Sequence, residues 1–373
     1  MKDLPFVSII VPCWNEEGTI RKTIQSLLML DYPKNKFEII AVDDGSTDGT
    51  WKEMQNFSNN PQVKIFQKEN GGKHTAVNLG IEHATGDFIG CLDSDSFVHN
   101  KALKRIIQTF RRSNDTMAVI PTLIIHNPKS FIQKVQVAEY DMAAYIKKVL
   151  SDIDAIQVTP GPFSFFRKEV FQKIGKFKKA HNTEDQEIAL RMHEAGMKIA
   201  LSPHSFVYTV SPNTTKKLYK QRVRWTYGFF KNVIDYKHML LKKKYGNIAT
   251  FTLPVALFTI GGVAVSTLIL LIRFVSNSIQ KIRGIYFAGF RTDGFHLFNL
   301  DWFFFNTDIV VFLSLFLVSI TFFWVFLGRK IAKGRGFLSF DIFYFLVAYY
   351  LLSPFWVFKS AWNTAISKKP SWR

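Results

Sequence analysis

The sequence predicts an α/β domain built on a doubly wound, mostly parallel sheet, followed by α-helical membrane segments. Over the first part of the chain, short apolar runs alternate with segments of helical periodicity, which is typical of a parallel sheet covered by helices. Polar clusters follow several of these runs directly, and ligands bind beyond the carboxyl ends of such strands. Long uncharged stretches lie in the last third of the chain and reach the length of a membrane span.

The alternation begins with a strand at residues 6–12 and a helix at 16–30. The apolar run at 6–12 is expected to form a strand buried on both faces. Apolar side chains recur at helical spacing through 16–30, and Tyr32-Pro33 ends this helix. The next expected strands and helices alternate at 37–42, 49–57, 63–66, 73–83, 87–92, 100–111 and 117–121.

After residue 121 the pattern is less regular, and we expect this part to complete the same domain. It contains an amphipathic stretch at 129–149 and a turn rich in Pro and Gly at 159–168. A helix begins at Thr183, where Thr183 and Gln186 fit a capping box. A basic helix covers residues 214–241 and is expected to lie at the membrane interface.

Three uncharged runs follow, at 248–272, 309–327 and 342–358, and Pro354 interrupts the last. One such run could be a buried core helix, but three in succession predict membrane spans. We therefore expect a first domain at 1–245 and a membrane domain at 246–373. The expected spans are 248–272, 307–327 and 339–358.

The formal net charge of +19 fits three environments: nucleic acid, an anionic membrane surface, and the cytoplasmic side of a membrane. Basic residues flank the uncharged runs, at 242–244 and again at Arg329, Lys330, Lys333 and Arg335. This placement favours the lipid bilayer as partner and puts the first domain in the cytoplasm. We find no DNA- or RNA-binding motif, so no nucleic-acid partner is expected.

The side of the membrane on which the last residues lie stays open. Three complete spans would place them outside, whereas Lys359, Lys368, Lys369 and Arg373 favour the cytoplasm. Either the third segment does not cross fully, or the charge rule fails here. The first residues show no signal-peptide pattern, which agrees with a cytoplasmic first domain.

Cys13 and Cys91 are the only cysteines of the chain. Each lies in an apolar run that reads as a buried strand. We expect both to be small core residues, with no disulfide framework.

Acidic clusters follow two of the predicted strands. Asp93 and Asp95 stand just past the strand at 87–92, and two carboxylates so placed can converge on Mg²⁺ or Mn²⁺ together with phosphate oxygens and water. Asp43 and Asp44 end the strand at 37–42 and can accept hydrogen bonds from a base or a ribose. Each cluster alone could equally be a solvated turn or a helix cap, so position at a strand end is what indicates a site.

Two further motifs open predicted helices: GGKH at 71–74 and TED at 183–185. Two glycines bring the backbone close to a ligand and Lys73 adds a cation, which suits a diphosphate, although the spacing is not that of a Walker P-loop. A carboxylate held at the start of the second helix could act as a general base. The alternatives are an exposed lysine after a glycine turn and an ordinary capping box.

The basic helix carries Gln221, Arg224 and Trp225 on one face, because they are spaced i, i+3 and i+4. Arg224 can neutralise charge that develops on a diphosphate leaving group. Trp225 offers a flat apolar surface to a sugar ring. The alternative is a juxtamembrane basic helix with an interfacial tryptophan.

Taken together and in this order, the motifs resemble glycosyltransferase family 2, which has the GT-A fold. They are PCWNEE (12–17), DDGS (43–46), GGKHTAVN (71–78), DSD (93–95), TED (183–185) and QRVRW (221–225). The TED and QxxRW pair is similar to the branch of cellulose, chitin, hyaluronan and poly-N-acetylglucosamine synthases. IQKVQVAEYD (132–141) and TPGPFSFFRKEV (159–170) look closest to the poly-N-acetylglucosamine and hyaluronan type. The resemblance covers about residues 5–235.

The resemblance implies a donor site for a UDP-sugar, with UDP-N-acetylglucosamine as one choice. Asp43 and Asp44 would bind the uridine. The other donor-binding residues would be Pro12, Glu16, Lys73, Asp93, Gln221 and Arg224. Asp93 and Asp95 would hold Mg²⁺ or Mn²⁺ at the diphosphate.

The resemblance also implies the reaction. Asp185 and Glu184 would be the catalytic residues, with Asp185 as the base that deprotonates an acceptor hydroxyl, and Trp225 and Gly161 would contact the acceptor. One in-line attack would invert the anomeric carbon and give a β-linkage. The chain is thus expected to be a metal-dependent hexosyl- or N-acetylhexosaminyltransferase of polysaccharide biosynthesis, multi-pass in the cell membrane.

Two enzyme hypotheses remain open. One is a polysaccharide synthase that extends a glycan, and the other transfers a single sugar to a polyprenyl-phosphate or another lipid acceptor. Relatives of the first type usually carry membrane helices before the catalytic domain, and none is expected before Val7, so secretion of a polymer would need a homo-oligomer or an export partner. A non-catalytic sensor should lose the base or the metal carboxylates, but Asp93, Asp95 and Asp185 are all present.

Overall fold

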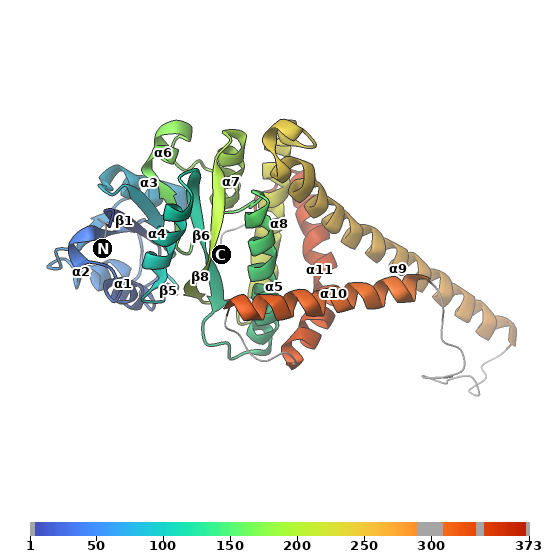
Figure 1. Ribbon diagram of the computed structural model, residues 1–373. Helices are drawn as coiled ribbons and strands as arrows, with labels where there is room; N and C mark the ends of the chain where they lie inside the picture. The colour runs from blue at the N-terminus through green and yellow to red at the C-terminus, as the bar shows by residue number, and fades with distance from the viewer. Residues whose placement is uncertain (1–3, 289–308, 333–338, 371–373) are drawn as a thin grey trace.

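The computed structural model describes residues 4–288, 309–332 and 339–370. The N-terminal part of the chain forms an α/β body, and long C-terminal helices project from the side of the body opposite β1 and α2 (Figure 1). The described part therefore consists of an α/β body followed by helices, and the domain boundary at residue 245 stays a prediction.

One sheet of eight strands runs through the body in the order β3-β2-β1-β4-β7-β6-β8-β5 within the described residues. The strands are β1 Val7–Cys13, β2 Phe37–Asp43, β3 Val63–Gln67, β4 Phe88–Cys91, β5 Ser96–Val98, β6 Thr116–Ile125, β7 Ser164–Arg167 and β8 Lys198–Thr209. The strands β3, β2, β1 and β4 are mutually parallel, and β6 is parallel to β8. The strands β7 and β5 run antiparallel to their neighbours, so the sheet is mixed.

Helices cover both faces of the sheet, and this is why β1, β2 and β4 are buried along their whole length. On one face, α1 (Ile20–Leu28) and α4 (Ala102–Arg112) pack against Ile9 of β1. On the other face, α3 (Lys73–His83) and α7 (Glu184–Glu194) pack in the cluster that contains Ile10. The doubly wound arrangement is confirmed.

Three strands lie outside the predicted pattern. The turn expected at 159–168 ends in the strand β7, whose Phe165 and Phe166 are both buried. Neither β5 nor β8 was predicted, because β5 has only three residues and β8 contains Pro203, which weakens a strand pattern. Cys13 and Cys91 are free and buried, as expected.

The remaining helices of the body are α2 (Thr50–Gln55), α5 (Phe131–Asp152), α6 (Lys168–Ile174) and α8 (Thr215–Asp235). The C-terminal helices are α9 (Leu253–Ala288), α10 (Ile309–Ala332) and α11 (Phe340–Ala365). The helix α11 lies beside α5 and α8 of the body, whereas α9 and α10 extend away from it (Figure 1).

The helix α10 meets α5 at a very close approach. A Cβ atom on Gly328 would lie 1.7 Å from the backbone oxygen of Asp141, so only glycine fits there. The next residue is Arg329, whose buried guanidinium pairs with Asp141 at 3.2 Å and with Asp341 of α11 at 2.6 Å. Arg329 is therefore a buried link between three helices, whereas the sequence analysis counted it as a charge of a cytoplasmic loop.

Two described segments are long and apolar enough to span a membrane, Ile248–Phe287 and Phe312–Ala332. The first continues well past the predicted end at residue 272, since the helix extends beyond the point where its side chains turn polar. The expected third span falls on α11, which is bent by 40° between Tyr349 and Leu351 and counts as a span only if both pieces are joined. Residues 307 and 308, Lys333, Arg335 and Arg373 lie outside the described residues.

The segment after α11 returns to the α/β body. The side-chain amide of Asn182 donates to the backbone oxygen of Pro370 at 3.2 Å. The ammonium of Lys231, on α8, donates to the hydroxyl of Ser367 at 3.1 Å. Residues 366–370 thus lie against the same domain that holds the predicted site residues.

Candidate active site

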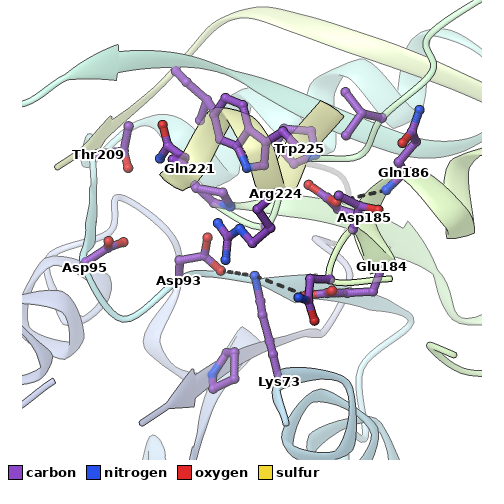
Figure 2. Close-up of a pocket in the computed structure, with 18 of the residues that line it drawn as sticks. Lys73, Asp93, Asp95, Glu184, Asp185, Gln186, Thr209, Gln221, Arg224 and Trp225 are labelled. Carbon is purple, nitrogen blue, oxygen red and sulfur yellow. Dashed lines mark hydrogen bonds and ion pairs between the residues drawn. The ribbon is translucent and has the colours of Figure 1, made fainter. Parts of the chain in front are cut away.

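A cavity of about 1280 Å³ opens at the carboxyl ends of the parallel strands, the place where such sheets bind ligands. Most of the predicted site residues line it. They are Pro12, Glu16, Asp44, Lys73, Asp93, Asp95, Gly161, Glu184, Asp185, Gln221, Arg224 and Trp225. Residues from all six motifs, which are far apart in the sequence, line it. Figure 2 shows labelled residues of four of these motifs around the cavity: GGKH, DSD, TED and QRVRW.

Asp43 is the one predicted residue that is not part of the cavity lining. Its carboxylate accepts hydrogen bonds from the backbone N–H and hydroxyl of Ser46 and from the amide of Gln67. It is fully buried and holds the turn after β2. The contact of Asp43 with uridine stays a prediction, and Asp44 is the acidic residue of this pair that lines the cavity.

Asp44 shapes the glycine loop that precedes α3. Its carboxylate accepts from the backbone N–H groups of Gly71, at 3.1 Å, and Gly72, at 2.8 Å. The ammonium of Lys68 donates to the same carboxylate at 2.8 Å. Gly72 has φ of 92°, a conformation that glycine adopts without strain. This turn fixes the start of α3 and with it the position of Lys73.

Lys73 links the DSD and TED motifs. Its ammonium lies 2.6 Å from the carboxylate of Asp93 and 3.9 Å from that of Glu184. Burial disfavours the charged ammonium, but Asp93 and Glu184 outweigh burial and raise the pKa of Lys73 above its usual value. Lys73 is therefore a permanent cation at the centre of the cavity, which suits a diphosphate.

Gly161 lies directly against this ion pair. A Cβ atom at this position would come within 2.5 Å of the Asp93 carboxylate and 2.6 Å of the Lys73 ammonium. The absence of a side chain leaves room for the pair. The structure thus places Gly161 beside Lys73 and Asp93, whereas the sequence analysis assigned it to the acceptor.

Asp95 has a more strongly raised pKa than Asp185, another acid of the site. Burial, then the charges of Asp93 and Glu16, raise the pKa of Asp95 to about 7. Within the described residues, no three His, Cys, Asp or Glu side chains are grouped as a ready metal cage. Mg²⁺ and Mn²⁺ commonly take one or two protein carboxylates and complete their shell with substrate phosphates, so crowded Asp93 and Asp95 fit an ion of this kind.

The TED motif is held in place by α8. The buried amide of Asn232 donates to the hydroxyl of Thr183 at 3.0 Å and to the side-chain oxygen of Gln186 at 3.1 Å. Gly228 allows α8 to approach, because a Cβ there would lie 2.2 Å from the Thr183 hydroxyl. The predicted capping box is wrong: Thr183 makes no side-chain cap, since both of its expected members bind Asn232 instead.

Asp185 is the second residue of α7, and it lines the cavity. The backbone N–H of Gln186 donates to this carboxylate at 3.0 Å. The hydroxyl and the N–H of Thr159 both donate to the backbone oxygen of Asp185 at 3.0 Å. Burial, followed by repulsion from Glu184, raises the pKa of Asp185 to about 6. A carboxylate with this pKa is ionised at neutral pH and is a stronger base than an exposed one.

Arg224 extends from α8 toward Asp93 and Lys73, and Gln221 and Trp225 belong to the same helix (Figure 2). Burial lowers the pKa of Arg224, and the carboxylates of Glu184 and Asp185 oppose this effect. The Trp225 side chain is 37% exposed and lines the cavity. The expected grouping of these three residues on one helix face is confirmed.

Other residues of the cavity escaped the sequence analysis. Tyr140 and Lys147 of α5 line it, as does Lys369 from the segment after α11. Burial lowers the pKa of Lys147 to about 8, an effect that Asp185 opposes. The helical spacing of 140 and 147 was visible in the amphipathic stretch, but nothing in the sequence shows which face of α5 meets the site.

Comparison with known proteins agrees with this site. Residues 8–175 match the family model described as glycosyl transferase family 2. The chain is 33% identical over 224 residues to a poly-beta-1,6-N-acetyl-D-glucosamine synthase of Staphylococcus epidermidis. It is 32% identical over 228 residues to one of Staphylococcus aureus.

These two alignments cover 60% and 61% of this chain, and 54% and 55% of the relatives. The chain thus spans about half the length of the curated relatives it matches. A solved structure, that of the mannosyltransferase PcManGT from Pyrobaculum calidifontis in complex with GDP-Man and Mn2+, matches with a TM-score of 0.58 at 17% identity. It covers 98% of this chain and 89% of that chain, and the predicted GT-A fold class is confirmed.

Proposed function

We propose that the protein is a membrane-bound, inverting β-glycosyltransferase that transfers a sugar from a UDP-sugar to a growing glycan. The observation that carries this proposal is the meeting of Asp185 with Lys73, Asp93 and Arg224 in one cavity. A buried carboxylate with a raised pKa faces a group of cations, which is the pairing that sugar transfer from a nucleotide donor requires.

The proposed donor is UDP-N-acetylglucosamine. This choice rests on the two staphylococcal relatives, whose names state a poly-N-acetylglucosamine product. Asp44, beside the glycine loop, and Pro12 and Glu16 at the end of β1 line the part of the cavity proposed for the uridine.

The proposed reaction needs a base on one side of the donor sugar and cations on the other. The Asp185 carboxylate accepts the proton of an acceptor hydroxyl, and the oxygen of that hydroxyl attacks the anomeric carbon. The bond from this carbon to the diphosphate oxygen breaks, and UDP leaves with the bonding electrons. Lys73 and Arg224 neutralise the charge on the departing diphosphate. Attack opposite the leaving group inverts an α-linked donor to a β-linked product.

A divalent cation completes the proposed donor site. Asp93 and Asp95 would hold it, and when bound it would neutralise the diphosphate as a Lewis acid. The structural neighbour from Pyrobaculum calidifontis was solved with Mn2+, which supports a divalent ion here without identifying it.

The proposed membrane arrangement has the catalytic domain in the cytoplasm and two crossing helices, α9 and α10. The two candidate spans support it, and so does the return of residues 366–370 to the catalytic domain. The helix α11 packs beside α5 and α8 of this domain (Figure 1), which favours a place at the membrane interface over a third crossing.

The experiment that tests this function measures UDP release by detergent-purified protein. UDP-N-acetylglucosamine, UDP-glucose, UDP-glucuronate and UDP-galactose are compared, each with Mg²⁺ or Mn²⁺. We expect turnover with UDP-N-acetylglucosamine and a loss of about 10²-fold or more in Asp185→Asn, the range typical of a lost general base. Glu194→Gln, at the far end of α7, is the matched control and should keep full activity.

The length of the product separates the two enzyme hypotheses. A ladder of chain lengths supports a polysaccharide synthase. A single sugar added to material in the lipid extract would instead establish transfer to a lipid acceptor. No UDP release with any donor and either metal ion would overturn the proposed function.

A further inference from the structure

Arg222 lies inside the QRVRW motif, at a position to which the proposed reaction gives no role. Its side chain is buried, with 7% of the residue exposed. The guanidinium donates to the carboxylate of Glu139, on α5, at 2.6 Å and to the hydroxyl of Tyr349, on α11, at 3.1 Å. The hydroxyl of Tyr349 also donates to Glu139. Three helices therefore meet at one charged, hydrogen-bonded group.

The same guanidinium lies over the ring of Trp225, with its central carbon 4.4 Å from the ring centre. The two residues are three positions apart on α8, so their side chains share one face of the helix. A guanidinium stacks well on an indole face, and the attraction is stronger where water is excluded. Arg222 thus supports one side of the Trp225 ring, while Trp225 also lines the cavity.

The support is anchored in α11. The Tyr349 ring packs edge-on against Trp356 of the same helix, with 5.6 Å between ring centres, and Trp356 is buried in a cluster with Val223 of α8. The ring of Tyr349 also contacts Phe345. Tyr349 is therefore fixed by apolar packing on α11. It reaches Arg222 through its hydroxyl, and the guanidinium also lies over its ring, 5.8 Å from the ring centre.

Without this support, the Trp225 side chain would be free to change rotamer at the cavity wall, because 37% of it is exposed. A platform for a sugar ring works only if it is held in one orientation. The salt bridge to Glu139 and the hydrogen bond to Tyr349 restrict the guanidinium, and the guanidinium restricts the indole.

We propose that Arg222 is a positioning residue that fixes the orientation of the Trp225 ring, on which the acceptor sugar stacks. Because Tyr349 holds Arg222, the orientation of this ring depends on the packing of α11 against α8. This inference rests on the proposed function, because it takes Trp225 as the contact of the acceptor. It assigns to α11, a helix outside the catalytic domain, a share in acceptor binding. Donor binding, which uses Lys73 and Asp93, is not involved.

The test measures the acceptor KM, the donor KM and kcat for the full-length protein, with a β-1,6-linked N-acetylglucosamine pentasaccharide as acceptor. Tyr349→Phe removes only the hydroxyl and keeps the ring contacts. We expect the acceptor KM to rise about tenfold, the effect of losing one hydrogen bond to a charged group. The donor KM and donor hydrolysis without acceptor should stay unchanged.

Two matched variants sharpen the result. Tyr344→Phe removes a hydroxyl from the same helix, where the ring packs on Phe131 and Phe340, and should leave the acceptor KM unchanged. Arg222→Lys keeps the charge beside Glu139 but loses the flat face over Trp225, and should raise the acceptor KM as Tyr349→Phe does.

The decisive comparison adds Tyr349→Phe to Trp225→Ala. If the hydroxyl acts through the indole, Tyr349→Phe should change the acceptor KM no further once the indole is gone. An acceptor KM equal to that of the wild type in Tyr349→Phe, or a full tenfold effect that persists without Trp225, would overturn the inference. The proposed function would survive either result, because it fails only if the wild type releases no UDP.

Discussion

Asp185 shows how one buried side chain sets the pH range of the proposed reaction. Burial and the neighbouring Glu184 raise the pKa of Asp185 to about 6. A general base must be deprotonated to act, so a raised pKa moves the loss of activity to higher pH. We expect kcat/KM to be constant above pH 7 and to fall as the pH drops through about 6, approaching tenfold per pH unit. The measurement is the initial rate of UDP release between pH 5 and 8.

The variant Glu184→Gln tests the cause of the raised pKa, because it removes a neighbouring negative charge. It should shift the acid limb of the kcat/KM profile toward lower pH. The shift has this sign because Glu184 contributes to the raised pKa of Asp185. A profile that stays flat down to pH 5 in the wild type would show that Asp185 does not act as the base with the pKa found here.

At the residue scale, the sequence could show which residue types carry the chemistry but not which way they point. Asp43 and Asp44 are adjacent and chemically identical, but Asp43 is the last residue of β2 and Asp44 is the first residue after it, so their side chains point in different directions. Asp44 meets the glycine loop, and Asp43 turns into the protein to bind Ser46 and Gln67. Lys147 and Arg222 were missed for a similar reason, since their partners come from helices far away in the sequence.

At the scale of elements, periodicity predicted α3 between the same residues that the structure shows. It failed where elements are short or where a long-range contact replaced a local one. The strand β7 has four residues, too few for a pattern, and its two phenylalanines are buried on opposite faces. Thr183 and Gln186 had the spacing of a capping box, but Asn232 of α8 binds both.

The contact between α10 and α5 gives a prediction at this scale. Gly328→Ala should force the two helices apart, because the new Cβ would lie 1.7 Å from the backbone oxygen of Asp141. Overpacking of this kind commonly costs about 1–3 kcal/mol, and it would also disturb the buried pair of Arg329 and Asp141. We expect a lower unfolding temperature in detergent, measured by the loss of monodisperse protein after heating.

Gly261→Ala is the matched control on α9, where a Cβ would meet nothing within 4 Å. In an open helix, alanine is favoured over glycine by about 1 kcal/mol, so this variant should be as stable as the wild type or slightly more stable. If both glycine variants behaved alike, the close approach of α10 to α5 would not be a feature of the folded protein in detergent.

At the scale of the whole molecule, the sequence did not determine on which side of the membrane the last residues lie, and the reason is physical. Hydropathy measures whether a helix is apolar enough to enter a bilayer, and it does not show what the helix packs against. The helix α11 is apolar, but it binds α8 through Trp356 and Val223 and α5 through Asp341, Arg329 and Asp141. These contacts, together with residues 366–370, are what favour an even number of crossings.

The expected arrangement places Lys368 on the same side of the membrane as the catalytic domain, and the outer end of α9 on the opposite side. Single cysteines can report this, because Cys13 and Cys91 are both buried and should react slowly. Lys368→Cys and Gln55→Cys, in exposed positions of the tail and of α2, should react with a membrane-impermeant maleimide only in inverted vesicles. Tyr286→Cys, which is 82% exposed near the end of α9, should react in intact cells.

The three positions together distinguish the alternatives. If Lys368→Cys reacted in intact cells like Tyr286→Cys, α11 would cross the membrane, and the contacts of Pro370 and Ser367 with the catalytic domain would be lost. If all three positions reacted only in inverted vesicles, neither α9 nor α10 would cross. Reaction of Lys368→Cys together with Gln55→Cys would agree with Lys369 lining the cavity, so that a segment after the membrane helices can contribute to the proposed site.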